Sequence, residues 1–237
     1  VQYSLTLVEG WSFRQVRAAL GRQEKLEQRL ADLDDKVLMD RLGLVGVSPE
    51  GRFFPDTYRY VRGMSDLDLL KQASARLDQV LDEEWARRAD GLPYRKPYDA
   101  LIMASMVEKE TGVAEERGQI AGVFVRRLRS GMRLQTDPTV IFGLGERYNG
   151  NLTRAHLQQP TPYNTYVIDG MPPTPIALAG REAIHAALNP VAGKSLYFVA
   201  RGDGSHVFSE TLEQHNRAVR EYQLKRRADY RSSPAPR

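Results

Sequence analysis

Apolar and polar residues alternate at the start of the chain, and the spacing then changes to that of helices. Residues 3–8 alternate as a strand does. Ser12 and Gln15 have the spacing of a capping box, which predicts a helix that continues through Leu20. Residues 21–48 are rich in charge and carry leucines and valines at helical spacing, so this segment is also predicted to be largely helical.

The most regular helical pattern follows a turn and an aromatic segment at 50–58. It opens at Ser65, keeps its apolar residues on one face and ends near Arg88. A glycine and two prolines within 89–97 then predict a connector. We expect the main domain boundary to fall in this connector.

A strongly apolar segment comes next. Residues 101–107 are apolar on nearly every face, which predicts a buried helix. Asp99 is expected to cap its start, and Gly112 is expected to end it. A second helix follows with an apolar face over 120–128, and Gly131 closes it.

The remaining chain is less periodic. Residues 132–180 contain many Pro, Thr, Gly, Asn and Tyr, which predicts a long irregular region, and loops of this length are usually functional or disordered. Its aromatic and apolar residues argue against disorder. A hairpin with a glycine turn is predicted over 196–208, and a last helix is predicted from Ser209 to about Leu224. Helices with one or two small sheets predict an α+β fold.

Composition narrows the classes of function without selecting one. The chain has 237 residues, of which 41% are hydrophobic, enough for a substantial core. It has no cysteine, which excludes thiol catalysis, disulfides and cysteine-based metal sites. The net charge of +4 supports a polyanionic partner only weakly, because a solvated helix face and tail explain the basic cluster between Arg217 and Arg231 equally well. No apolar run reaches the ~18 residues of a membrane span.

Two carboxylates stand where the buried helix is expected to stop. Glu108 and Glu110 are two positions apart, about 200° around a helix, so they cannot share a face. One can face a cleft while the other is solvated or paired with a cation. The helix dipole and partial burial both raise a carboxyl pKa there, as a general acid requires. Spacing alone leaves open a simple solvated helix end.

The other motifs in the sequence indicate no further catalytic or metal site. The four histidines lack the spacing of a zinc site, and we expect ordinary surface or hairpin positions for them: His156, His185, His206 and His215. No nucleophile elbow or dinucleotide fingerprint is present in the sequence. The aromatic residues of the long irregular region suit two roles equally well, stacking on sugar rings or packing the loop onto the core.

Several motifs in fixed order carry a resemblance to a known family. They are ASMVEKET at 104–111, VFVRRL at 123–128, GMRLQTDPTV at 131–140, PYNTY at 162–166 and GMPP at 170–173. Together with EGRFFPDTY at 50–58 and the C-terminal hairpin, they closely resemble the MltG (YceG-like) endolytic murein transglycosylases of bacteria. The resemblance covers nearly the whole chain.

The resemblance implies an organisation for the whole protein. Members have a short cytoplasmic tail, one inner-membrane helix and a periplasmic region with a small LysM-like subdomain before the catalytic domain. The chain starts at Val1 in a predicted strand, so we expect a fragment without the anchor and most of the LysM-like part. The expected divisions are the end of the LysM-like subdomain or a joint at 1–20, the helical part of the YceG-like region at 21–97, the catalytic core at 98–230 and a frayed tail at 231–237.

The resemblance also implies a reaction. The family cleaves the β-1,4 bond between N-acetylmuramic acid and N-acetylglucosamine in nascent peptidoglycan strands, leaves 1,6-anhydro-N-acetylmuramic ends and so terminates elongation. A glycoside hydrolase usually needs two carboxylates. A lytic transglycosylase uses the 6-hydroxyl of its substrate as nucleophile, so one glutamate can serve as acid and base without metal or organic cofactor. Peptidoglycan strands are the expected partner, together with peptidoglycan synthases (penicillin-binding proteins).

The family motif places the catalytic acid within Glu-Lys-Glu-Thr. Other lytic transglycosylases carry a serine after the catalytic glutamate, so Glu110 before Thr111 fits better than Glu108 before Lys109. Glu110 is therefore the expected acid and base, with Glu108 in reserve. The expected substrate-binding residues are Thr111, Gln135, Asp137, Thr139, Tyr163, Asn164 and Tyr166.

Three other functions remain to be separated from this one. A non-catalytic peptidoglycan-binding module would hold glycan without cutting it, and a hydrolytic muramidase would leave reducing ends. The hypothesis of a nucleic-acid-binding protein is supported by a pI of about 9.3 and by the basic C-terminal helix. The sequence lacks a basic stripe interleaved with aromatics or a known reading motif, so we expect no nucleic-acid partner.

Overall fold

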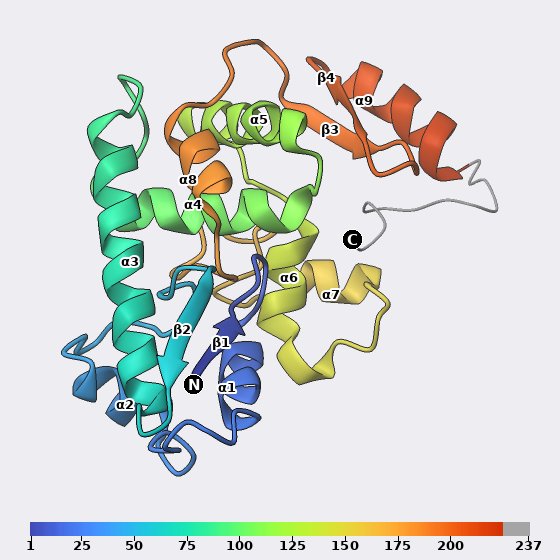
Figure 1. The fold of residues 1–237 in the computed structure, drawn as a ribbon. Coiled ribbons are helices and arrows are strands. Elements are labelled where there is room, and N and C mark those ends of the chain that lie inside the picture. The colour runs from blue at the N-terminus through green and yellow to red at the C-terminus, as the bar shows by residue number, and fades with distance from the viewer. Residues whose placement is uncertain (225–237) are drawn as a thin grey trace.

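The computed structural model describes residues 1–224 (Figure 1). Its N-terminal half contains β1 (Gln2–Thr6), α1 (Phe13–Gly21), α2 (Asp35–Arg41), β2 (Thr57–Val61), α3 (Asp66–Ala86) and α4 (Pro97–Glu110). Its C-terminal half contains η1 (Ala114–Glu116), α5 (Arg117–Arg129), α6 (Asp137–Leu144), η2 (Gly145–Arg147), α7 (Arg154–Gln158), α8 (Arg181–Leu188), β3 (Tyr197–Ala200), β4 (His206–Ser209), α9 (Leu212–Val219) and η3 (Arg220–Leu224). The predicted α+β class is confirmed, since these helices accompany the two-stranded antiparallel sheets β1–β2 and β3–β4.

The N-terminal predictions of a strand and a capped helix are confirmed. β1 pairs with β2 in a register that sets Gln2 opposite Val61 and Thr6 opposite Thr57. Helix α1 starts with the predicted capping box, in which the Ser12 side chain accepts from the Gln15 backbone amide. Apolar residues of β1, α1, α2, β2 and the first turns of α3 form one buried cluster.

The prediction of helix over 21–48 is wrong for most of its length, because only α2 is helical. Leu26 and Leu30 are buried, as their spacing suggests, but they lie in turns. The Asp66 carboxylate accepts from the amides of Arg29 and Leu30, and Arg17 donates to the Leu30 carbonyl at 2.9 Å. These side chains form hydrogen bonds with backbone amides and a carbonyl that would bond to one another in a helix.

Helix α3 begins and ends close to the predicted positions. Ser65 and Asp68 form the capping box at its start. Its first turns bury Leu69, Leu70 and Ala73 in the N-terminal cluster. Its later turns bury apolar residues in a second, larger cluster with α4, α5 and α8. One amphipathic helix therefore joins two hydrophobic clusters along one side of the molecule (Figure 1).

Helix α4 is buried as predicted and crosses the middle of the molecule beside α8 and α5 (Figure 1). All residues from 100 to 107 are buried. The prediction that Asp99 caps the start of this helix is wrong only as to position, because the helix begins at Pro97 with Lys96 as its N-cap, and Asp99 is the N3 residue of the capping box. Proline suits a first helical position, where no backbone N–H is needed. Asp99 instead lies in the first turn, and its carboxylate accepts from the amides of Arg95 and Lys96 at 2.8 and 3.3 Å.

The predicted irregular region 132–180 contains two helices, α6 and α7, that its composition concealed. Helix α6 has almost no polar face, and α7 is a single short turn capped by Thr153. The sequence pattern also missed α8, an alanine-rich helix packed against α4. The rest of the region lies against the core, with Ile176 and Leu178 fully buried.

The predicted hairpin is confirmed as β3 and β4, with Tyr197 opposite Ser209 and Ala200 opposite His206. The last helix starts later than predicted, since Thr211 is its cap and Ser209 still belongs to the strand. The predicted frayed tail at 231–237 and the basic residues from 225 onward lie outside the described residues. No helix among residues 1–224 has the length and apolar character needed to cross a membrane.

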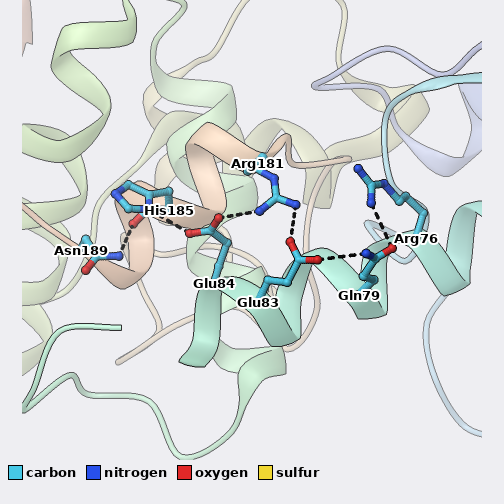
Figure 2. A network of polar contacts seen from close by, with 7 residues as sticks. All are labelled: Arg76, Gln79, Glu83, Glu84, Arg181, His185 and Asn189. Carbon is cyan, nitrogen blue, oxygen red and sulfur yellow. Dashed lines mark hydrogen bonds and ion pairs between the residues drawn. The ribbon is translucent and has the colours of Figure 1, made fainter. Parts of the chain in front are cut away.

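A polar network connects α8 to α3 across their contact (Figure 2). Arg181 of α8 donates to Glu83 at 2.7 Å and to Glu84 at 2.8 Å. His185, one turn further along α8, contacts the second oxygen of Glu84 at 2.8 Å. Only 5% of the Glu84 side chain is exposed, so its charge depends on these two partners.

Candidate active site

Glu110 is the last residue of α4 and is half-buried. One of its oxygens, Oε1, accepts a hydrogen bond from the Thr136 hydroxyl just before α6. Burial raises the pKa of Glu110 to about 7, and the negative charge of Asp137 acts in the same direction, while the bond from Thr136 opposes them. A carboxyl group with this pKa is divided between its acid and base forms near neutral pH, as general acid–base catalysis needs.

A cluster of buried threonines fixes the hydroxyl that contacts Glu110. The Thr136 amide donates to the Thr165 hydroxyl at 3.0 Å. Thr139 donates to the Thr136 carbonyl at 2.8 Å and lies 2.8 Å from the Thr165 hydroxyl. Thr139 was predicted to contact substrate, but it is fully buried in this cluster. Sequence reasoning missed Thr136 and Thr165, although both stand inside the motifs that carry the family resemblance.

Gln135 and Asp137 flank Thr136 on the exposed side. Tyr166 donates from its hydroxyl to Asp137 Oδ1 at 2.7 Å. Burial, followed by the charge of Asp137, raises the pKa of Tyr166, so its phenol stays protonated and remains a donor. The structure therefore brings Glu110, Gln135, Asp137 and Tyr166 to one place.

Two predicted substrate residues lie further along the same region. Asn164 is fully buried, and its amide nitrogen donates to three carbonyls of the segment that contains α7, those of His156, Leu157 and Gln159. Tyr163 is half-buried, packs edge-on against Phe142 with ring centroids 4.8 Å apart, and shares a hydrogen bond with Thr174. Asn164 thus organises the loop, while part of Tyr163 stays accessible.

Thr111 follows Glu110 but turns into the interior. It is buried, its hydroxyl accepts from the Val113 amide at 2.9 Å, and it lies 3.4 Å from a carboxylate oxygen of Glu116. Glu116 is buried too and pairs with His206 of the hairpin at 2.7 Å. His206 does lie in the hairpin, as expected, but it is buried. Thr111 therefore anchors the end of α4.

Glu108 points to different surroundings from Glu110, in keeping with their 200° separation. It is half-buried, and its Oε2 accepts from the Gly180 amide at 3.0 Å. Burial raises the pKa of Glu108, and the nearby charge of Glu9 adds to this. The expectation that the second glutamate is solvated or paired with a cation does not describe Glu108, whose carboxylate is held by a backbone amide.

Two open hollows lie at the far ends of the helices that carry the site. One of about 410 Å³ is at the start of α4 and is lined by Pro93, Arg95, Lys96, Tyr98, Asp99, Ile102, Met171, Pro172 and Pro173. One of about 460 Å³ is between α1 and the end of α6 and is lined by Phe13, Arg14, Arg17, Asp35, Ser48, Pro49, Glu50, Phe142 and Glu146. Within residues 1–224, no three His, Cys, Asp or Glu side chains are grouped so that they could hold a metal ion.

A buried helix that ends in a half-buried, hydrogen-bonded carboxyl group defines a candidate acid–base site. Comparison with known proteins identifies the family. The model of the YceG-like family matches residues 1–221, so the chain belongs to the YceG-like family, and the resemblance seen in the sequence is confirmed.

Similar proteins carry related names. An endolytic murein transglycosylase of Bacillus subtilis (strain 168) is 31% identical over 241 residues, covering 93% of this chain and 65% of that protein. An endolytic murein transglycosylase of Streptococcus pneumoniae (serotype 2, strain D39) is 30% identical over 180 residues, covering 73% of this chain and 32% of that protein. A crystal structure of a yceG-like protein from Listeria monocytogenes matches with a TM-score of 0.76 at 30% identity, over 92% of this chain and 75% of that one. The chain thus spans less than two thirds of both curated relatives.

Proposed function

We propose that this chain carries the catalytic region of an endolytic peptidoglycan lytic transglycosylase. Its substrate would be the β-1,4 bond between N-acetylmuramic acid and N-acetylglucosamine, and its product a 1,6-anhydro-N-acetylmuramic end that terminates strand elongation. The observation that carries the proposal is Glu110, whose pKa burial raises to about 7 at the site where family motifs meet. The names of the similar proteins support the same activity.

The proposed reaction needs one group that first gives and then takes a proton. Protonated Glu110 donates its proton to the glycosidic oxygen as the bond from that oxygen to C1 of the muramic residue breaks. The 6-hydroxyl oxygen of the same residue then bonds to C1, and Glu110 accepts the hydroxyl proton. The acid form is restored, and no water is consumed. Because Thr136 holds Oε1, we assign Oε2 to the substrate.

The neighbouring side chains suit a carbohydrate. Gln135 and Asp137 are exposed beside Glu110 and can bond to hydroxyl or acetamide groups, while Tyr166 orients Asp137. Phe142 lies five residues beyond Asp137, about 7.5 Å along α6, where it lines the hollow toward α1. We propose that a bound strand runs from Glu110 along α6 past Phe142 and Tyr163. The burial of Thr111, Thr139 and Asn164 favours a role in shaping this wall.

A hydrolytic muramidase is the second candidate, because Asp137 supplies another carboxylate close enough to influence Glu110. Such an enzyme would use Asp137 as nucleophile or as the base for a water molecule and would leave reducing ends. Glu108 is the reserve candidate for the acid. A binding module without catalysis is the third reading that the experiment has to separate.

The test is mass spectrometry of purified peptidoglycan strands digested by the native chain and by Glu110→Gln and Glu108→Gln. We expect anhydro-muramic ends from the native chain and from Glu108→Gln, and no cleavage by Glu110→Gln. Reducing ends would favour the hydrolase and Asp137. Activity lost in Glu108→Gln but retained in Glu110→Gln would move the acid to Glu108, and absence of cleavage by the native chain would contradict the proposal.

The cellular setting is also proposed from the family. We propose that the region works in the bacterial periplasm, attached to the inner membrane by a single-pass helix and acting beside peptidoglycan synthases. We retain the division into residues 1–20, 21–97 and 98–230 as a proposal about sequence segments, with the first segment as the end of a LysM-like subdomain. Fractionation of cells that express the whole protein would test the location.

A further inference from the structure

Arg127 belongs to the VFVRRL motif, to which the proposed reaction gives no role. It lies near the end of α5 and is only 6% exposed. Its guanidinium donates to four oxygens and lies over a ring: Leu196 O at 2.6 Å, Arg133 O at 2.8 Å, Leu134 O at 3.2 Å, Gln135 Oε1 at 3.1 Å, and the Tyr197 ring with its centroid 5.0 Å away.

The partners of this buried charge are unusual. Among residues 1–224, the groups that receive its hydrogen bonds are carbonyl and amide oxygens and not carboxylates. A planar guanidinium with donors in a fixed fork fixes the positions of such oxygens better than a lysine can. Three of the four oxygens belong to consecutive residues, 133 to 135, which directly precede Thr136. The charge of Arg127 is therefore used to hold this short segment.

The segment that Arg127 holds is strained. Gln135 has a φ of 53°, the one non-glycine residue within 1–224 with a φ in the left-handed region. Such a backbone persists only where its surroundings hold it, and it is characteristic of functional sites. Arg127 holds the Gln135 side chain, and the Thr165 carbonyl accepts from the Gln135 amide at 3.1 Å.

The turn at Gln135 determines where the next residue points. Thr136 has an extended backbone, its amide donates to Thr165, and its hydroxyl donates to Oε1 of Glu110. If Gln135 relaxed to a negative φ, the direction of Thr136 would change and this hydroxyl would leave the carboxylate. A continuous set of contacts thus runs from Arg127 through Gln135 and Thr136 to Glu110.

We propose that Arg127 is a positioning residue for Glu110, acting by holding residues 133–135 so that the Thr136 hydroxyl is aimed at the carboxylate. The catalytic consequence rests on the proposed function, whereas the effect on the protonation of Glu110 does not. Because the Thr136 hydrogen bond stabilises the charged form of Glu110, its loss raises the pKa of Glu110.

The neighbouring Arg126 offers a matched control. It donates to the carbonyls of Ser195 and Val191 at 2.7 and 3.0 Å, so it secures the same segment before β3 that Arg127 contacts at Leu196. It donates to no atom of residues 133–135 in the part of the chain that the structure describes. Arg126→Lys and Arg127→Lys therefore lose similar contacts to this segment, and only the second releases the turn at Gln135.

The experiment measures the pKa of Glu110 by NMR titration of ¹³C-carboxyl-labelled glutamate, with the signal assigned by its loss in Glu110→Gln. In Arg127→Lys we expect the pKa to rise by roughly half a unit or more, as in Thr136→Val, and to stay at its native value in Arg126→Lys. The double variant Arg127→Lys/Thr136→Val should show no further rise, because both changes remove the same hydrogen bond.

Activity gives a second readout. A group that must be protonated to act loses activity as pH rises through its pKa, so Arg127→Lys should move the alkaline limb of the pH–rate profile to higher pH. We expect kcat to fall about tenfold with little change in KM, since the interaction lost is to the catalytic group. Arg126→Lys should keep the native profile. If the native protein does not cleave peptidoglycan, the proposed function fails while the titration still decides the positioning.

Two results would overturn the inference. The first is that folded Arg127→Lys keeps the native pKa of Glu110 although Thr136→Val raises it. The second is that Arg126→Lys raises the pKa of Glu110 as much as Arg127→Lys does. Should Arg127→Lys not fold, Gln135→Ala decides instead, because it removes one Arg127 contact at an exposed residue. A smaller rise of the Glu110 pKa is expected in that variant, and an unchanged value would contradict the proposal.

Discussion

At the scale of single residues, the carboxyl group of Glu110 is kept where its neutral form is favoured. The pKa of about 7 in the folded protein exceeds the value of about 4.3 expected in an unfolded chain. The folded state therefore binds this proton more tightly. The stability that this tighter proton binding by Glu110 adds to the free energy of unfolding is fully present below about pH 4, and it is lost as pH rises from about 4 to 7.

A test of stability follows from this sign. Glu110→Gln removes the titration, so we expect the variant to be more stable than the native protein at pH 8 by about 1 to 3 kcal/mol, with less gain at pH 5. Urea denaturation at both pH values measures the difference. The exposed Glu115→Gln serves as the control, with no gain expected at either pH. An equal change at pH 5 and pH 8 would contradict the assigned burial of the Glu110 charge.

Tyr166 is the neighbour whose loss should affect catalysis and not folding. Tyr166→Phe removes the donor to Asp137 and keeps the ring, so we expect kcat/KM to fall three- to tenfold, as for one lost hydrogen bond of about 1 kcal/mol. Tyr94→Phe is the control, because that phenol donates to the Ala187 carbonyl away from Glu110. We expect the control to lower Tm and leave kcat/KM unchanged. If Tyr166→Phe lowered Tm and left kcat/KM unchanged, Tyr166 would have no part in catalysis.

At the scale of elements, the contact of α3 with α8 depends on the network around Glu84 (Figure 2). Burial tends to raise the pKa of Glu84, but the bonds from His185 and Arg181 outweigh it and keep the pKa below its ordinary value. A depressed carboxyl pKa contributes stability above the pKa of the unfolded chain, and that contribution is lost as pH falls through the folded value. The α3–α8 contact should therefore weaken in acid.

We expect Glu84→Gln to lower the free energy of unfolding by about 2 kcal/mol at pH 7, because Arg181 and His185 lose a charged partner. The difference between Glu84→Gln and the native protein should begin to shrink below about pH 4 and should vanish only once pH has fallen through the lowered pKa of folded Glu84, where its carboxyl group is as neutral as the glutamine. Glu83→Gln is the matched control on the exposed side of the same arginine, where a much smaller loss of stability is expected because solvent screens that ion pair. If Glu84→Gln and Glu83→Gln lowered the free energy of unfolding equally, the burial of Glu84 would not strengthen its interactions with Arg181 and His185.

The elements also show what local sequence can and cannot predict. Helices α1 and α3 were predictable because caps and apolar spacing agree, and α4 because it is apolar on all faces. The turns around Leu26 and Leu30 were not, since they depend on the distant carboxylate of Asp66. The position of Glu110 at the end of a buried helix was predictable from the apolar run that precedes it. The Thr136 hydroxyl and the role of Arg127 were not, because tertiary contacts alone create them.

At the scale of the whole molecule, two hydrophobic clusters share α3, and Leu178 of the long region completes the N-terminal one. Arg14 of α1 is also paired with Glu146 beyond α6. Residues 98–224 alone would lose the apolar face of α3, including Leu77 and Val80, and would expose α4. The proposed division at residue 97 therefore separates α3 from the α4 residues that share its hydrophobic cluster.

We therefore expect a fragment of residues 98–224 to unfold without a cooperative transition and to bind a hydrophobic dye, whereas residues 1–224 unfold cooperatively. Thermal denaturation followed by near-ultraviolet circular dichroism compares the two. Deleting two fully buried leucine-sized side chains from a core already costs about 4 to 10 kcal/mol, comparable with the stability of a domain. A cooperative transition in the fragment would mean that the larger cluster folds without α3.

The central claim is that Glu110 directs the 6-hydroxyl of the substrate, and not water, to the broken bond. The most direct measurement is mass spectrometry of the ends formed when the native chain and Glu110→Gln digest intact strands in H₂¹⁸O. The account predicts that every new end from the native chain is anhydro-muramic and free of ¹⁸O, and that Glu110→Gln forms none. Reducing ends that carry ¹⁸O, or native activity in Glu110→Gln, would contradict it.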